Sequence, residues 1–259
     1  MHEVLERRFA AMGARLSVAE RPWNGSPRID VLEDRRGEYF DITFAGEASE
    51  VDLEVIDVRP SDRHLLLLAR SAGEKSKFLL GHDERHWFVA AVPEAARGVT
   101  GVTTAKLALQ PRAVRSALDR ARPKDRFRRR NAAYVRQGEW FFVPAPQLRV
   151  DDAFVLRDEP LTRGSGKAHV LQYAWRTGGT VIYANRRTPM GISEARYQRL
   201  APQQRRSGSW MRLARDPEVY AKGAVRHADH ATIVLPTWHR VHMNTEHDAR
   251  AMQHVVFID

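Results

Sequence analysis

The first hundred residues are divided by turn signals into short apolar runs, and this spacing constrains the fold more than any other feature of the chain. The runs are rich in β-branched and aromatic residues, and they lie at 38–44, 51–58, 64–70, 77–80 and 87–92. Clusters of Gly, Pro, Asp and Ser between them are typical of tight turns that join antiparallel strands. Apolar and acidic residues alternate in Val51-Asp-Leu-Glu-Val55, as in a sheet with one face in water. We therefore predict a meander, a small barrel or a sandwich, preceded by a short helix over 3–12.

Between residues 100 and 130 the apolar residues change to helical spacing, with an interruption at Pro111. The residues concerned are Val102, Ala105, Leu109, Val114 and Leu118. The stretch ends in Lys124-Asp-Arg-Phe-Arg-Arg-Arg130, and residues 101–140 contain 11 basic and 3 acidic side chains. An exposed arginine run of this kind contacts phosphates in nucleic-acid-binding proteins, and the alternative is a solvated helix end or a linker.

Short strands and helices are predicted to alternate after this connection. Glu139–Pro144 is a buried strand, and 168–175 and 180–184 form a hairpin around Thr177-Gly-Gly179. Ser193 is placed as the N-cap of a helix that continues to Arg206. Asp216-Pro217 starts a second short helix, which ends at Gly223.

These patterns together predict a mixed α+β fold in three parts. Residues 1–97 form an acidic, mostly antiparallel β domain, 98–134 a helical arginine-rich connection, and 135–259 a basic α+β domain that ends in a β-hairpin. An apolar content of 43% with 29% charged residues is ordinary for a folded globular protein. The length of 259 residues is sufficient for a substantial core.

Charge is distributed unevenly along the chain. Residues 1–100 carry 14 basic and 18 acidic side chains, whereas the remainder carries 28 basic and 14 acidic ones. A one-sided positive field attracts polyanions, of which nucleic acid is the usual one. Our first hypothesis is therefore a nucleic-acid-interacting protein whose basic half contacts the phosphate backbone of DNA or RNA. The side chains predicted to make these contacts are Arg126, Arg128, Arg129, Arg130, Arg163 and Lys167.

Cysteine is absent, which excludes disulfides, thiolate zinc sites and cysteine nucleophiles. A bound metal must therefore use nitrogen and oxygen ligands. The apolar runs are far shorter than the roughly 18 residues that a membrane span requires, and the first residues lack the apolar core of a signal peptide. We expect a cytoplasmic protein without a membrane partner.

Six of the 11 histidines lie between His227 and His254. We predict a hairpin here, with strands around 231–235 and 240–243 joined at Pro236-Thr-Trp238. On a regular strand, residues three apart point to opposite faces, which separates His227 from His230 and His239 from His242. The four histidines therefore cannot all converge without a bulge. Depending on the turn register, His230 faces Met243 or His242, and only the second arrangement gives a pair of metal ligands.

The order Asp229-His230, Asn244, His254 resembles the Asp-His, Asn, His order of HNH-type ββα-metal endonucleases. The resemblance covers about 26 residues and implies His230 as general base and Asn244 as the residue that positions the site. It implies Asp229 and His254 as ligands of one divalent ion, Mg, Mn or Zn, and the alternative hairpin register adds His242. Such an ion would stabilise the leaving oxygen of a phosphodiester.

Other motifs exclude several classes of enzyme. Arg163-Gly-Ser-Gly-Lys-Ala-His169 has Leu161 and Ala168 where a phosphate-binding loop needs Gly and Ser or Thr. His82-Asp-Glu-Arg-His86 has the histidine spacing of a helical zinc motif, but strand patterns flank it and predict a hairpin loop. The chain also contains no Gly-x-Ser-x-Gly elbow and no dinucleotide fingerprint.

Three hypotheses of function result. The first is the nucleic-acid-interacting protein, and the second is a metal-dependent nuclease or phosphodiesterase that uses the histidine-rich hairpin. The third is a non-catalytic protein–protein module of a larger assembly, whose acidic and basic halves contact different partners. In the first and third cases, the histidines lie on the solvent-exposed face of a hairpin or form hydrogen bonds with nearby acidic residues.

Overall fold

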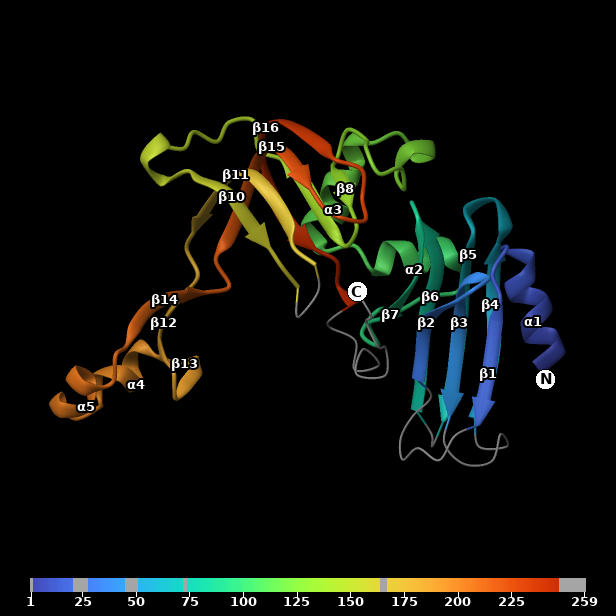
Figure 1. The fold of residues 1–259 in the computed structure, drawn as a ribbon. Helices are drawn as coiled ribbons and strands as arrows, with labels where there is room; N and C mark the ends of the chain where they lie inside the picture. Colours follow the sequence, from blue (N-terminus) through green and yellow to red (C-terminus); the bar gives the residue numbers. More distant parts are fainter. Residues whose placement is uncertain (1, 21–27, 45–50, 72–73, 164–166, 247–259) are drawn as a thin grey trace.

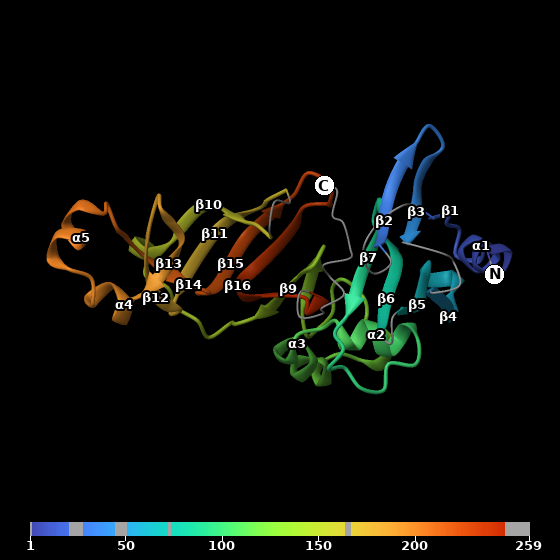
Figure 2. The same ribbon diagram turned by 90° about the horizontal axis from the view of Figure 1, so that it is seen from below.

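The computed structural model describes residues 2–20, 28–44, 51–71, 74–163 and 167–246. This part of the chain is a mixed α+β structure with mostly antiparallel sheets, as the sequence predicts. Its four sheets follow one another from the N-terminal body to a second body and then to a small projecting unit (Figures 1 and 2). None of the described helices has the length and apolar character needed to span a bilayer.

The N-terminal body contains one helix and two sheets. Helix α1 (His2–Ala11) precedes a three-stranded sheet of order β1 (Leu16–Glu20), β3 (Gly37–Phe44), β2 (Arg28–Asp34). Strand β1 runs parallel to β3, and β2 pairs with β3 in antiparallel register. The second sheet is the predicted antiparallel meander of β4 (Val51–Arg59), β5 (His64–Ser71), β6 (Glu74–Asp83) and β7 (His86–Val92).

Strand β5 is covered on both faces, which explains its uninterrupted run of leucines. Leu65 and Leu67 belong to a core that also contains residues from α1 and the three-stranded sheet. Leu66 points to the opposite face, where it packs in a second core with residues of helix α2 (Val102–Ala108). All four residues from Leu65 to Leu68 are buried as a result.

The connection to the second body is helical and broken at Pro111, as predicted. Helix α2 ends before this proline, and α3 (Arg112–Ala117) begins directly after it. Single 3₁₀ turns follow at η3 (Leu118–Arg120) and η4 (Pro123–Asp125). The amide of Val102 donates to Asp57 Oδ2 at 2.9 Å, which fixes the start of α2 against the meander.

A six-stranded antiparallel sheet forms the second body. Its core contains apolar side chains from all six strands, including Phe142, Leu171 and Val225. In spatial order its strands are β10 (Leu156–Leu161), β11 (His169–Thr177), β15 (Glu218–Arg226), β16 (Ile233–Met243), β9 (Trp140–Pro144) and β8 (Val135–Gln137).

The predicted hairpin between 168–175 and 180–184 is wrong, because its two strands belong to different sheets. Strand β11 pairs with β10 and β15, whereas β12 (Thr180–Asn185) pairs with β13 and β14. Gly178 and Gly179 adopt φ of +67° and +84°, which favour glycine, and they carry the chain from one sheet to the other. A side chain at Gly179 would approach Arg215 O to 2.7 Å.

The helix predicted over 216–223 is also wrong, since this segment enters strand β15. The C-terminal hairpin is present, but its turn lies at residues 227–232 rather than at Pro236. Strand β16 continues through Pro236 because the β15–β16 register shifts there, from Gly223↔Leu235 to Ala221↔His239. Proline lacks an amide proton and is tolerated at such a bulge.

The small projecting unit, residues 180–215, is called the arm below. It contains β12, β13 (Thr188–Ser193), β14 (Met211–Arg215), α4 (Glu194–Gln198) and α5 (Pro202–Ser207). Ser193 caps α4 as predicted, with Oγ accepting from Arg196 N at 3.3 Å. The single helix predicted to Arg206 is two helices, because Pro202 can begin a helix but cannot continue one.

The turn between β6 and β7 joins the two bodies by ion pairs. Asp83 pairs with Arg129 and with Arg136, the latter at 2.7 Å, and Glu84 also pairs with Arg129. Burial opposes ionisation of Asp83, but the two guanidinium groups outweigh it and lower the pKa of this carboxyl. The arginine run predicted as a nucleic-acid contact thus contributes Arg129 to the joint between the bodies.

Asp83→Asn should therefore destabilise the protein by about 1–3 kcal/mol, because it leaves Arg136 without its charged partner and removes one of the two carboxylates that pair with Arg129. The matched control is Asp158→Asn, which removes an ion pair with Arg226 whose side chains are 66% and 52% exposed. An exposed pair contributes less than about 1 kcal/mol. Urea unfolding measures both variants, and equal stabilities would contradict a structural role for Asp83.

Candidate metal centre

Three histidines of the second body converge. His169, His227 and His230 each offer a ring nitrogen, and these three atoms lie within 4.8 Å of one another. The rings are stacked, with centroids 4.2 Å apart for His169–His227, 4.7 Å for His227–His230 and 5.7 Å for His169–His230. Within the described ranges, this group can hold a metal ion.

Strand register brings the first two histidines together. Strands β11 and β15 pair antiparallel with Val170 opposite Arg226, so the next position along each strand places His169 opposite His227. Strand β15 ends at Arg226, and the chain turns after it. This turn brings His230 to the same side of the sheet as His169 and His227. The strand parity that would separate His227 from His230 does not apply, because both residues lie beyond the strand.

His169 is the buried member of the group, at 2% exposure, and neither of its ring nitrogens has a hydrogen-bond partner among the described residues. Burial lowers its pKa to about 3, with a further contribution from the two neighbouring histidines, so the ring is neutral. A buried polar atom without a partner costs about 1–3 kcal/mol. The arrangement is therefore unfavourable unless something binds to these nitrogens.

Gly138 lies against the nitrogens of two of the histidines. A Cβ added to it would lie 2.9 Å from His230 Nε2 and 3.5 Å from His169 Nε2. Both Nε2 atoms thus face the space beside this glycine, which the missing side chain keeps open. Gly138 has a φ of +56° in the turn between β8 and β9, so the backbone also favours glycine.

A carboxylate stands behind His230. Its Nδ1 atom lies 3.4 Å from Glu84 Oε2 without making a hydrogen bond to it, while its Nε2 atom faces the open space. Metal-binding histidines usually have such a carboxylate on the second ring nitrogen, because it fixes the ring orientation. Burial lowers the pKa of His230, and the nearby His227 adds to this effect.

The loop that carries His227 and His230 is held from two sides. Glu84 Oε2 accepts a hydrogen bond from Ala231 N at 3.0 Å. Gln137 Nε2 donates to Ala231 O at 2.7 Å. The β6–β7 turn of the first body and the last residue of strand β8 in the second body therefore both position this loop.

His227 differs from the other two histidines because both of its ring nitrogens have contacts. Its Nδ1 atom accepts from Asp229 N at 3.1 Å, and its Nε2 atom lies 3.3 Å from Lys167 O. A metal at either nitrogen must displace one of these contacts. We therefore expect His227 to be the weakest of the three ligands.

The structure brings only one of the predicted site residues into this group. His230 is a member, whereas Asp229 pairs with Lys167 at 2.9 Å and His242 stands opposite Phe141 in the β16–β9 ladder. Asn244 is bound to the β8–β9 turn by its backbone, with N donating to Glu139 O at 2.9 Å. His254 lies outside the described residues.

Sequence reasoning missed His169, which lies in the excluded phosphate-loop motif. The only sequence feature that could have identified His169 is its position at the start of a predicted strand, directly after a glycine-rich turn. That signal becomes specific only when the pairing of β11 with β15 is known, because His227 is distant in the sequence.

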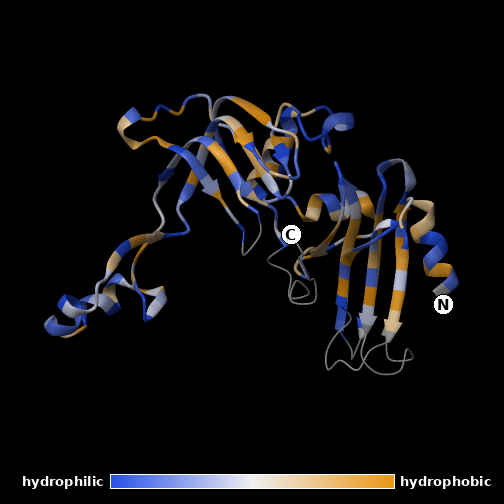
Figure 3. Cartoon of the chain, in the orientation of Figure 1, coloured by the Kyte–Doolittle hydropathy of each residue, from blue (hydrophilic) through white to orange (hydrophobic). Residues whose placement is uncertain are grey.

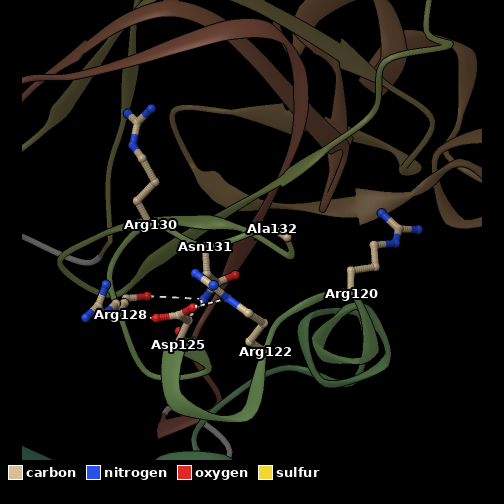
Figure 4. Close-up of a pocket in the computed structure, with 7 residues that line it drawn as sticks. All are labelled: Arg120, Arg122, Asp125, Arg128, Arg130, Asn131 and Ala132. Carbon is tan, nitrogen blue, oxygen red and sulfur yellow. Dashed lines mark hydrogen bonds and ion pairs between the residues drawn. The ribbon is translucent and has the colours of Figure 1, made fainter.

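Several of the predicted phosphate-binding side chains are engaged within the protein. Arg163 pairs with the buried Glu246, and Arg128 Nε lies 3.2 Å from Asp125 Oδ1. Arg130 donates to Val234 O at 3.2 Å. Figure 4 shows Asp125 between Arg122 and Arg128 in a hollow of about 220 Å³. This acidic residue neutralises part of the positive charge there, which reduces the attraction for phosphate.

Comparisons of the chain with protein-family models, curated proteins and solved structures give no match. Function must therefore be inferred from the geometry of the histidine group and from the distribution of charge.

The buried histidines also predict how stability depends on pH. Burial lowers the pKa of His64 and of His242 to about 4, and that of His169 to about 3. The unfolded chain therefore binds protons below about pH 6.5 that the folded chain does not bind, so stability falls as the pH falls toward 4.

Between pH 7.5 and 5.5 we expect a loss of about 1 kcal/mol for each of these three histidines. The measurement is urea unfolding of metal-free protein in chelator at the two pH values. A free energy of unfolding that stays constant over this interval would contradict the burial of neutral imidazoles.

Proposed function

We propose that the chain binds one divalent transition metal through His169, His227 and His230. The observation that carries this proposal is the pair of unpartnered nitrogens on buried His169, beside His230 Nε2 and the open face of Gly138. Three imidazole ligands favour zinc over magnesium or manganese, which prefer oxygen ligands. Zinc is thus the ion that fits best among the three expected from the sequence.

We further propose that the metal centre is hydrolytic. Structural zinc sites usually have four protein ligands, whereas catalytic sites have three and keep one position open. A divalent ion in such a site acts as a Lewis acid toward oxygen. The net charge of +10 attracts anionic substrates, so a phosphodiester is the substrate class that we favour.

The protein's own residues supply orientation around the centre. Glu84 lies 3.4 Å from His230 Nδ1, and Glu84 and Gln137 both hold the loop that carries His227 and His230 through Ala231. Trp140 lies edge-on to His169, with centroids 6.4 Å apart, and contributes an apolar wall. In this proposal His230 is a metal ligand rather than the general base that the HNH-type resemblance implies.

His169→Ala should abolish stoichiometric zinc binding, because it removes the ligand that lacks other partners among the described residues. The matched control is His242→Ala, a histidine of the same sheet outside the group, which should bind zinc like the unmodified protein. Untagged protein is stripped with chelator and titrated with zinc by calorimetry. Equal binding by His169→Ala and the unmodified protein, or less than about a tenth of an equivalent bound by the unmodified protein, would refute the metal centre.

The same two variants test the reaction. The zinc-loaded protein should hydrolyse bis(p-nitrophenyl) phosphate or an oligonucleotide, and His169→Ala should lose this activity while His242→Ala keeps it. Zinc binding without hydrolysis of either substrate would leave the metal centre in place and refute the hydrolytic proposal.

Gly138→Ala should weaken zinc binding by about tenfold or more, because its methyl group would fill the space beside the two Nε2 atoms. The matched control is Gly98→Ala. Gly98 also has a positive φ, of +71°, but an added Cβ there would have no neighbour within 4 Å. The two variants therefore share the backbone strain and differ in the blocked space. Equal zinc affinities would show that the metal does not bind on the Gly138 side.

A further inference from the structure

The arm is strongly basic for its size. Residues 180–215 contain eight arginines and one acidic residue, Glu194. The arm extends away from the two bodies (Figures 1 and 2), and hydrophilic residues predominate at its tip (Figure 3). Its charge is therefore presented to solvent rather than to the rest of the protein.

Most of these arginines have no side-chain partner among the described residues. Arg205 donates to Gln198 Oε1 at 3.1 Å, and Arg215 donates to Met190 O. Six other exposed guanidinium groups make no hydrogen bond or ion pair within the described part of the chain: Arg186, Arg187, Arg196, Arg199, Arg206 and Arg212. They differ in this respect from Arg129 and Arg163 of the bodies, which pair with carboxylates.

Three aromatic rings cluster among these arginines. Tyr183 and Tyr197 are stacked, with centroids 3.7 Å apart and planes at 2°, and Trp210 meets Tyr197 edge-on at 5.7 Å. None of the three rings is fully buried, so part of each is accessible. Tyr183 and Arg212 are direct cross-strand partners of β12 and β14, which places a ring and a guanidinium side by side on one face.

The arm buries little apolar surface of its own. Its buried apolar side chains are Ile182, Ala184 and Ile192. Met190, Met211 and Leu213 are 78%, 60% and 43% exposed, and every residue of β14 is exposed. A three-stranded sheet with an open strand face presents apolar and cationic groups together to a binding partner.

We propose that the arm binds single-stranded nucleic acid. Guanidinium groups pair with phosphate oxygens in bidentate geometry, and exposed bases stack on aromatic and apolar side chains. The combination of solvent-exposed arginines with an aromatic cluster favours this partner over a lipid surface, which needs a larger apolar face for insertion. This site is separate from the three histidines and does not depend on the metal.

The test uses the full-length protein and fluorescein-labelled 20-nucleotide rU and dT strands in fluorescence anisotropy with chelator present. The arm variant carries five arginine-to-glutamine changes, at Arg186, Arg187, Arg199, Arg206 and Arg212. The control variant loses the same charge from exposed positions elsewhere, at Arg8, Arg35, Arg97, Arg112 and Arg115. Circular dichroism establishes that both variants are folded.

We expect the unmodified protein and the control to bind the strands, with the arm variant weaker by about tenfold or more. The slope of log affinity against log salt should flatten by up to about 3.5 in the arm variant, at roughly 0.7 for each phosphate that an arginine no longer neutralises. His169→Ala should bind like the unmodified protein, which separates this result from that of the metal centre. Comparison of the dT and rU strands shows whether the arm binds DNA, RNA or both.

Three outcomes would overturn the proposal. The first is equal binding by the arm and control variants, and the second is no binding of either strand at 50 mM salt. The third is binding to vesicles of phosphatidylserine and phosphatidylcholine but not to the strands, which would identify a lipid surface as the partner.

Discussion

The ion pairs between the β6–β7 turn and the two arginines of the second body are the contact on which the candidate site depends. Asp83 anchors this turn to Arg129 and Arg136, and the adjacent Glu84 can then reach both Ala231 and His230. The first body thus places a carboxylate beside a candidate metal ligand that the second body supplies. The arginine-rich segment, which charge alone associates with nucleic acid, contributes Arg129 to the contact with the first body.

The sequence predicted the local structure well where periodicity and proline determine it. The meander of the first body, the helical break at Pro111 and the cap at Ser193 all follow from short-range patterns. Strand pairing does not follow from such patterns. The glycines after β11 fit a hairpin turn, but the partners of β11 lie elsewhere in the sequence, and only the whole sheet decides between the two arrangements.

The candidate site shows the same limitation more sharply. The histidine-rich segment was visible in the sequence, and His230 was among its predicted site residues. In the structure His230 lies beside His169 and His227, and among the described residues this group does not include the partners that the sequence predicted. His169 was not predicted as a site residue, because an isolated histidine can be recognised as a ligand only when the residue opposite it in the sheet is known. The role of a charged residue is similarly ambiguous in the sequence. Arg129 and Arg212 are the same residue type, yet Arg129 lies in an ion pair with Asp83, whereas Arg212 has its guanidinium in solvent.

Strands β11 and β15 connect the two sites that we propose. Strand β11 begins at His169 and ends beside the arm, and β15 begins beside the arm and ends next to His227, each with nine residues. At about 3.3 Å per strand residue, the pair is a stiff spacer of about 30 Å. A small ester could occupy the metal centre without contacting the arm, whereas a polymer engaged by both would have to bridge that length. The length of a ligand would thus determine whether the two sites act on it separately or together.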